Sequence, residues 1–213
     1  MKNKGFFITG TDTGVGKTFF SLLLMKKYNF NYWKPIQTGN TTENDTLYIK
    51  NIIGIKNNKF YKSIYSFKKP LSPHLASHHE NVSINIKKIN KPNSDDPIII
   101  EGAGGILVPL NKKNLIIDLI KKFNFPVVIV SKSILGTINH TLMTINILKR
   151  NKINVFGVIL NNVKNKKEGN NNAKSIEIFG KVKVIGQVPF VNQITNKKIE
   201  KLLKKKFIQQ FKI

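Results

Sequence analysis

Short apolar runs alternate along the chain with longer stretches whose apolar residues recur at helical spacing. Runs rich in β-branched residues predict strands, and apolar positions every three to four residues predict helices. The predicted strands are Gly5–Thr9, Tyr32–Ile36, Pro97–Ile100, Pro126–Val130, Val155–Leu160 and Val182–Ile185. The first helix is predicted to begin at Lys17. Five further helices are predicted at Glu43–Ile53, Leu115–Phe123, Thr137–Arg150, Ala173–Phe179 and Ile199–Phe211. This alternation predicts an α/β fold with a mostly parallel central sheet and helices on both faces.

The segment 56–93 is the least regular part of the pattern, and we expect it to be a long connection. No internal repeat or linker-like stretch interrupts the rest, so we expect one domain spanning residues 1–213. The N-terminal lysines lead into a strand and a glycine-rich segment, which is unlike a signal peptide. No apolar stretch approaches the roughly 20 residues that a membrane helix needs. We therefore expect a cytoplasmic protein with no membrane association.

The formal net charge of +25 raises nucleic-acid binding as an alternative function, because a basic surface attracts nucleic acid by releasing counterions. The lysines, however, are scattered among asparagines and isoleucines, and Arg150 is the only arginine. We interpret them as solvated surface positions encoded by an A/T-rich gene and expect no nucleic-acid partner. The chain has no cysteine, which excludes disulfides, thiolate metal sites and a cysteine nucleophile.

The strongest chemical signal is the segment Gly10-Thr-Asp-Thr-Gly-Val-Gly-Lys-Thr18 between a predicted strand and a predicted helix. Its glycines let successive backbone N–H groups turn toward phosphate oxygens, and the helix N-terminus behind them favours an anion. Lys17 would reach the β- and γ-phosphates, and the Thr18 hydroxyl would bind Mg²⁺. The usual phosphate-loop spacing would place a glycine where this chain has Thr11. The segment predicts a nucleoside triphosphate site with Mg²⁺.

An acid and a second glycine cluster follow the predicted strand Pro97–Ile100. Glu101 leaves the carboxyl edge of the sheet, where parallel sheets bind ligands, and we expect it to be a second Mg²⁺ partner. The segment Gly102-Ala-Gly-Gly105 can direct further N–H groups toward phosphates. The alternative is a surface glutamate before a flexible turn.

Two further charged residues are candidates for the same sheet edge. Lys34 stands at the end of a predicted strand, where its charge could stabilise phosphoryl transfer. Asp45 lies in the first turn of a predicted helix, where the helix dipole favours an acid. Taken alone, each is better explained as an ordinary solvated residue.

Three histidines in the irregular segment raise a different possibility. His74 and His78 are four residues apart, as on one helix face, and His79 follows them. The only adjacent carboxylate with ligand spacing is Glu80. We therefore expect these histidines to serve local packing or hydrogen bonding instead of a metal.

Together these segments resemble the dethiobiotin synthetase family. The matching stretches occur in family order from residue 5 to about residue 190 and begin with the phosphate loop. They are TGTDTGVGKT (9–18), WKPIQTG (33–39), ND (44–45), SPH (72–74), EGAGG (101–105), LGTINH (135–140), LNN (160–162) and GQVPF (186–190). The resemblance implies a P-loop NTPase-like three-layer fold and an ATP- and Mg²⁺-dependent ligase of biotin biosynthesis. It implies that 7,8-diaminononanoate and CO₂ or bicarbonate give dethiobiotin on a homodimer, with release of ADP and phosphate. A carbamate and a carbamic-phosphoric anhydride would be the intermediates.

The resemblance also assigns roles to individual residues. Lys34 and Lys17 become catalytic, and Thr18, Asp45 and Glu101 become Mg²⁺ ligands. The substrate contacts it implies are Thr38, Gly136, Thr137 and Asn139. The ATP contacts it implies are Gly14, Val15, Gly16, Lys17, Thr18, Phe19, Asp45, Glu101, Gly102, Ala103, Gly104, Asn161, Asn162, Pro189, Phe190 and Val191. Of these, Asn161, Asn162 and Pro189 to Val191 would line the adenine. Two positions depart from familiar family residues: Gly14 replaces an acid found in some relatives, and Asn162 replaces an aspartate.

A partitioning ATPase of the related switch type is a rival interpretation. Such proteins carry an extra lysine early in the phosphate loop, at the position where this chain has Asp12. The sequence therefore favours a metabolic enzyme over a partitioning ATPase.

Overall fold

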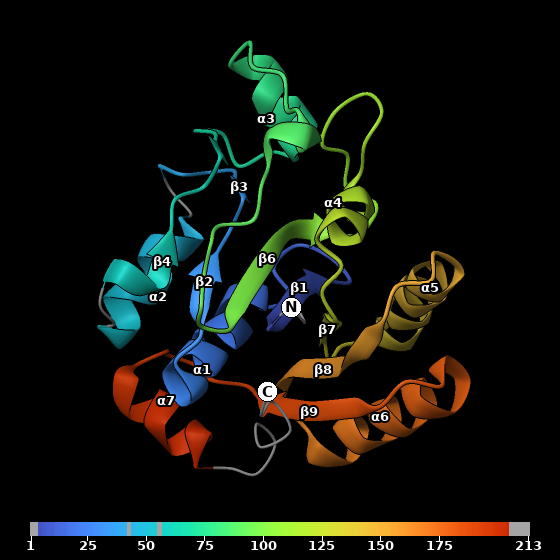
Figure 1. The fold of residues 1–213 in the computed structure, drawn as a ribbon. Coiled ribbons are helices and arrows are strands. Elements are labelled where there is room, and N and C mark those ends of the chain that lie inside the picture. The colour runs from blue at the N-terminus through green and yellow to red at the C-terminus, as the bar shows by residue number, and fades with distance from the viewer. Residues whose placement is uncertain (1–3, 42–43, 55–56, 205–213) are drawn as a thin grey trace.

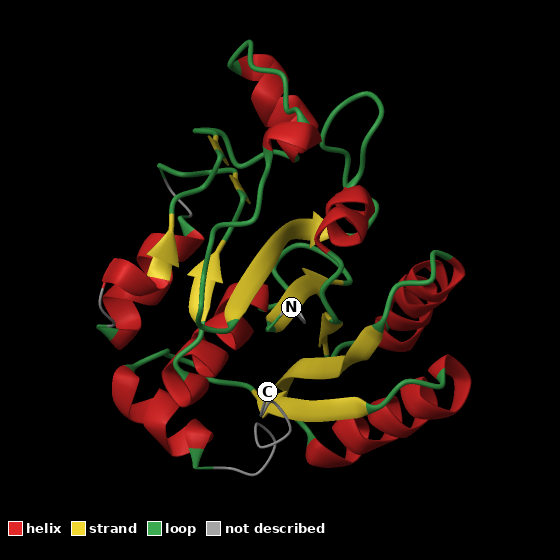
Figure 2. Cartoon of the chain, viewed as in Figure 1, coloured by secondary structure: helices red, strands yellow, loops and turns green. Residues whose placement is uncertain are grey.

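The computed structural model describes residues 4–41, 44–54 and 57–204. Within these residues, seven strands form one parallel sheet in the order β4-β2-β6-β1-β7-β8-β9 (Figures 1 and 2). The strands of this sheet are β1 (Gly5–Gly10), β2 (Asn31–Trp33), β4 (Phe60–Tyr61), β6 (Ile98–Gly105), β7 (Val127–Lys132), β8 (Val155–Val163) and β9 (Val184–Pro189). A separate parallel pair consists of β3 (Ile36–Gln37) and β5 (Tyr65–Ser66).

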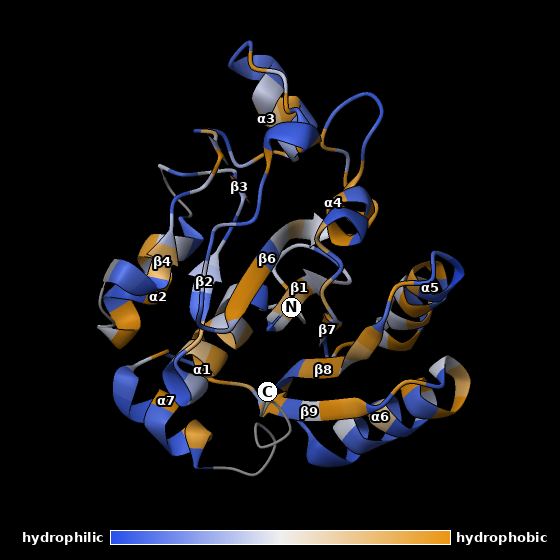
Figure 3. Ribbon diagram, in the orientation of Figure 1, coloured by the Kyte–Doolittle hydropathy of each residue, from blue (hydrophilic) through white to orange (hydrophobic). Residues whose placement is uncertain are grey.

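Helices cover both faces of the sheet, which confirms the predicted three-layer α/β fold. Side chains alternate along β1, so Phe6 and Ile8 pack on one face while Phe7 packs on the other. The first face is covered by α1 (Lys17–Tyr28), α2 (Asp45–Ile53) and α7 (Asn196–Leu203). The opposite face is covered by α3 (Pro73–His79), α4 (Ile116–Phe123), α5 (Thr137–Arg150) and α6 (Lys166–Gly180). Figure 3 shows apolar strands between helices whose outer faces are largely polar.

The predicted strand Tyr32–Ile36 is wrong in its bounds, because the chain leaves the main sheet after Trp33. β2 ends there, and β3 begins at Ile36 and pairs with β5 instead. The break falls at Lys34 and Pro35, and proline has no N–H to donate to a ladder. Lys34 is thereby released from the strand at the carboxyl edge of the sheet.

Other elements are longer than predicted. Glu101 and Gly102–Gly105 belong to β6 and not to a loop. Glu101 pairs with Ile8 of β1 and, after a shift of register, Gly105 pairs with Gly10. β8 likewise includes Asn161 and Asn162. Helix α6 begins at Lys166 and not at Ala173, with the Asn165 side chain accepting hydrogen bonds from the backbone N–H groups of residues 167 and 168. Its polar first turns hid this start from the apolar pattern.

The segment 56–93 is more ordered than the predicted irregular connection. Its described part contains β4, β5 and α3, together with the 3₁₀ turns Asn57–Lys59 and Ile86–Lys88. The predicted helix start at Glu43 and the predicted continuation of the last helix over residues 205–211 lie outside the described residues. None of the helices described is both long and apolar enough to cross a membrane.

Candidate active site

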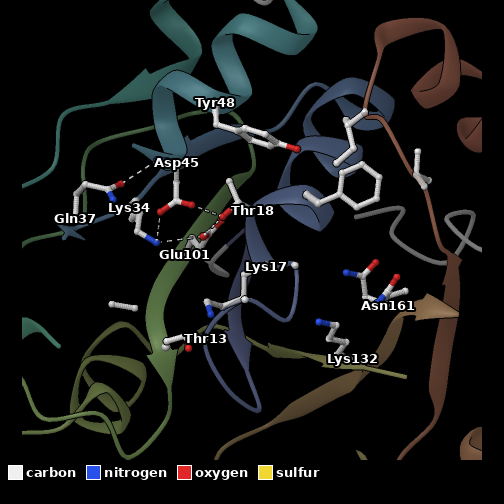
Figure 4. A pocket seen from close by; sticks show the side chains of 18 of the residues that line it. Thr13, Lys17, Thr18, Lys34, Gln37, Asp45, Tyr48, Glu101, Lys132 and Asn161 are labelled. Atoms are coloured by element: carbon white, nitrogen blue, oxygen red, sulfur yellow. Dashed lines mark hydrogen bonds and ion pairs between the residues drawn. The ribbon is translucent and has the colours of Figure 1, made fainter. Parts of the chain in front are cut away.

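A cleft of about 520 Å³ opens at the carboxyl edge of the sheet, within the usual size of small-molecule sites. Most of the residues singled out by the sequence line it. They are Gly14, Gly16, Lys17, Thr18, Phe19, Lys34, Thr38, Asp45, Glu101, Ala103, Gly104, Asn161, Asn162, Pro189, Phe190 and Val191. They come from five segments far apart in the chain, and the parallel strand order brings those segments to one edge (Figure 4).

The loop between β1 and α1 forms the floor of this cleft. Gly16 has a φ of +97°, and a Cβ at this position would overlap the Asn161 side chain, so only glycine fits. The Asn161 amide donates to the Val15 carbonyl at 2.8 Å and fastens the loop to β8. The first intrahelical bond of α1 runs from the Phe20 N–H to the Gly16 carbonyl. The three preceding N–H groups of the helix therefore have no partner within it and can receive an anion.

The Lys17 side chain folds back across this loop. Its ammonium donates to the Asp12 carbonyl at 3.0 Å. Burial, together with repulsion by the Lys34 ammonium, lowers the pKa of Lys17 to about 8. A lysine whose charge is disfavoured by burial gains strongly from a nearby polyanion.

Beside the loop, one hydroxyl, one ammonium and two carboxylates form a compact cluster, which we call the acid–lysine cluster: Thr18, Lys34, Asp45 and Glu101 (Figure 4). The Thr18 hydroxyl lies 2.5 Å from an Asp45 oxygen and 2.9 Å from Glu101 Oε1. The Lys34 ammonium lies 2.8 Å from the other Asp45 oxygen and 3.2 Å from Glu101 Oε1. One lysine thus bridges two carboxylates.

The two carboxylates of the acid–lysine cluster are each held by the element that carries them. Glu101 is fully buried in β6 and accepts hydrogen bonds from Ser21 at 2.8 Å and Tyr32 at 3.1 Å through its second oxygen. The Gln37 side chain accepts from the Asp45 backbone N–H at 3.2 Å and so fixes the first turn of α2. These contacts preorganise both carboxylates.

The charges of the cluster stabilise one another. Burial alone would lower the pKa of Lys34, but the Glu101 and Asp45 carboxylates raise it above its ordinary value. Burial would raise the pKa of Asp45, but the Lys34 ammonium lowers it below its ordinary value. Lys34 is therefore a charged ammonium in the cluster.

The oxygens of the cluster suit a divalent cation. Thr18 has a single hydroxyl proton, yet a carboxylate oxygen from each of Asp45 and Glu101 lies within hydrogen-bond distance of it. Lys34 supplies one positive charge against two carboxylates. Hydroxyl and carboxylate oxygens around a site that also faces phosphates form the donor set that Mg²⁺ prefers.

Part of the cleft lining is apolar. Phe190, Val191 and Ile194 form its wall after β9, and Phe190 is half exposed. The Lys164 ammonium lies 5.3 Å from the centroid of the Phe190 ring. An aromatic wall beside polar amides suits the planar base of a nucleotide.

Five residues expected in the site lie away from the cleft. Val15 belongs to the loop but its side chain is buried, and Gly102 packs against the Phe7 ring. Gly136, Thr137 and Asn139 form the start of α5, where Thr137 is buried against Ser131 at 2.8 Å and Asn139 is exposed. The residues at the start of α5 therefore do not share the cleft with Lys34 within one chain.

Sequence reasoning missed several residues that line the cleft, among them Tyr48 and Lys132. Tyr48 follows Asp45 by three residues on α2, so helical spacing could have placed it on the same face. Lys132 ends β7, which was predicted to stop at Val130. Gln37 belongs to the quoted stretch 33–39 but had been given no role, and no sequence signal marks Ile194.

The histidines of α3 make local contacts. The Ser72 hydroxyl lies 3.1 Å from His74 Nδ1, and the Lys69 ammonium lies 3.3 Å from His79 Nδ1. These contacts fit the expected role in local hydrogen bonding.

Comparison with known proteins gives relatives of high sequence identity and, at low identity, solved structures that share the fold. Residues 4–198 match the family described as AAA domain. An ATP-dependent dethiobiotin synthetase of Lawsonia intracellularis is 44% identical over 190 residues, which cover 89% of this chain and 90% of the relative. One of Paramagnetospirillum magneticum is 40% identical over 192 residues, which cover 90% and 91%. A plasmid partition protein of Borrelia burgdorferi, solved with AMPPNP, superposes with a TM-score of 0.59 at 13% identity and covers 99% of this chain and 96% of its own. At that identity, the likeness concerns the fold alone.

Proposed function

The chain belongs to the dethiobiotin synthetase family, and from this membership we propose that it converts 7,8-diaminononanoate, CO₂ and ATP to dethiobiotin, ADP and phosphate. The observation that carries the proposal is the acid–lysine cluster beside the phosphate loop. It gathers a hydroxyl, two carboxylates and an ammonium next to the three backbone N–H groups that have no partner within α1. Such a site is suited to bringing anions together.

We further propose that ATP occupies the cleft with its phosphates on the loop and its base against Phe190. Thr18, Asp45 and Glu101 would hold Mg²⁺, which supplies neutralisation of phosphate charge when bound. Lys17 would then approach the terminal phosphates, because an incoming polyanion competes with the Asp12 carbonyl for its ammonium. We propose that the base preference rests on Asn161 and Asn162, which also line the cleft.

The proposed chemistry needs no nucleophilic side chain. One amine of the substrate takes up CO₂, loses a proton and becomes a carbamate. A carbamate oxygen attacks the γ-phosphorus of ATP, and ADP leaves. The second amine then attacks the carbamoyl carbon of the mixed anhydride, and phosphate leaves as the ring closes. Lys17 and Lys34 would stabilise the negative charge where the carbamate meets the phosphoryl group.

Since the start of α5 does not share the cleft with Lys34 within one chain, we propose that the carboxylate of the substrate binds at the start of α5 of a second subunit. Gly136 begins this helix in a left-handed conformation, and the exposed Asn139 lies in its first turn. A helix N-terminus favours an anion by about 0.3–2 kcal/mol.

We also propose a homodimer, since Leu107, Leu135 and Met143 expose apolar surface around this helix. Sedimentation as a monomer at micromolar concentration would contradict the dimer.

The experiment that tests the function is incubation with 7,8-diaminononanoate, ¹³C-bicarbonate and MgATP. Mass spectrometry is expected to find one ¹³C atom in newly formed dethiobiotin, with one ADP released for each molecule. An analogue with a methyl group in place of the carboxylate is expected to bind more weakly than the diamine. ATP hydrolysis without labelled dethiobiotin would reject the proposed reaction. Stimulation of that hydrolysis by DNA would favour the partitioning ATPase.

The metal assignment makes a separate prediction. Glu101→Gln keeps the shape of the side chain but removes one of two carboxylates in the acid–lysine cluster. The Mg²⁺ concentration for half-maximal turnover is expected to rise by at least about tenfold, since even outer-shell partners of a metal contribute that much. The matched control is Glu168→Gln, on an exposed position of α6. An unchanged Mg²⁺ requirement in the Glu101 variant would remove Glu101 from the metal site.

A further inference from the structure

Lys132 is a charged residue of the cleft for which the proposed reaction provides no role. It is the last residue of β7, it is half-buried, and it lines the same cleft as Lys17. In Figure 4 its side chain lies beside Asn161 and extends toward the interior of the pocket. The neighbouring strands and the charged groups of the cleft indicate which ligand group Lys132 can bind.

The strand registers place Lys132 beside the phosphate loop. On one side, Gly10 pairs with Val130, and the Thr11 N–H donates to the Val130 carbonyl at 3.1 Å. β7 then continues for two residues alongside the start of the loop. On the other side, Lys132 pairs in register with Asn161, the residue that holds the Val15 carbonyl. Lys132 therefore lies between the two points at which neighbouring strands fasten the loop.

Among the residues that the structure describes, none neutralises the charge of Lys132. The other charged residues that line the cleft are Lys17, Lys34, Asp45 and Glu101. Lys34 forms ion pairs with both carboxylates, and the Lys17 ammonium has a carbonyl partner. Within the described residues, the structure gives the Lys132 ammonium no hydrogen bond and no ion pair. A half-buried cation beside a phosphate-binding loop calls for an anionic partner.

We propose that Lys132 is a further nucleotide-binding residue whose ammonium pairs with a phosphate oxygen of the bound nucleotide. The inference rests on the proposed nucleotide site and adds a third lysine to it. An ammonium offers three donors and no acceptor, and phosphate oxygens are charged acceptors, so the contact is a charge-assisted hydrogen bond.

The test compares Lys132→Met with wild-type protein in calorimetric titrations of adenosine, AMP, ADP and ATP, all with Mg²⁺ and without the diamine. We expect ATP affinity to fall by about tenfold to a hundredfold, the size of a lost hydrogen bond between charged groups. Adenosine affinity stays unchanged, and the first nucleotide of the series to lose affinity identifies the phosphate contacted. Lys132→Arg retains most of the ATP affinity because it keeps the charge.

The matched control is Lys121→Met, which removes the same charge from an exposed position of α4. Equal weakening of adenosine and ATP would overturn the inference, as would wild-type ATP affinity in Lys132→Met. An equal loss in Lys121→Met would also overturn it, because the effect would then come from net charge. The titrations contain no diamine, so they remain decisive even if no dethiobiotin forms in the activity assay.

Discussion

Lys17→Ala is expected to reduce dethiobiotin formation by about a thousandfold or more, because it removes a buried positive charge at the site proposed for the terminal phosphates. In the structure the ammonium crosses the phosphate loop to the Asp12 carbonyl, at a pKa lowered to about 8 by burial and by Lys34. Phosphate oxygens would replace that carbonyl with a partner of full charge. The effect should be largest as negative charge builds up during phosphoryl transfer.

The measurement is single-turnover formation of labelled dethiobiotin, with Lys27→Ala as the control. Lys27 lies on the same helix but is exposed, so its substitution changes net charge without touching the cleft. Thermal unfolding of both variants shows whether the fold is intact. Turnover within about tenfold of wild type in a folded Lys17→Ala protein would show that this loop is not the phosphate site.

The layout of the fold could be predicted from local patterns. Alternating β-branched runs and helical spacings indicated a parallel sheet with helices on both faces, and the structure has both. Glycines at 14 and 16 before Lys17 indicated the phosphate loop, because few other functions need a backbone that turns successive N–H groups inward. Parallel strands end at one edge, so Lys34 and Glu101 could be expected on the same side of the sheet.

The contacts between segments could not be predicted in the same way. Nothing in the local sequence shows that Lys34 bridges Asp45 and Glu101, because each residue taken alone resembles a solvated one. The glycines after Glu101 suggested a loop, yet β6 continues to Gly105, which pairs with β1 again after a shift of register. Lys132 was overlooked because the predicted strand stopped at Val130, two residues before the end of β7. In each case tertiary pairing, which acts between distant segments, decides the outcome.

Lys34→Gln is expected to separate binding from turnover. The change removes the ammonium that bridges Asp45 and Glu101 at 2.8 Å and 3.2 Å. Mg²⁺ can neutralise these carboxylates when nucleotide is bound, and the loop with Lys17 still holds the phosphates. Affinity for a non-hydrolysable ATP analogue should therefore stay within about tenfold of wild type, a change of ~1.4 kcal/mol.

Turnover of the Lys34→Gln variant should fall far more, by about a hundredfold or more, because the ammonium is needed as carbamate and phosphoryl group approach. The control is Lys62→Gln, an exposed lysine after β4. Calorimetry at saturating Mg²⁺ and single-turnover assays on the same preparations give the two values. If affinity falls as far as turnover, Lys34 acts by assembling the two carboxylates for nucleotide binding. If neither affinity nor turnover changes, Lys34 has no part in the reaction. Its charge then serves only to neutralise Asp45 and Glu101 in the nucleotide-free protein.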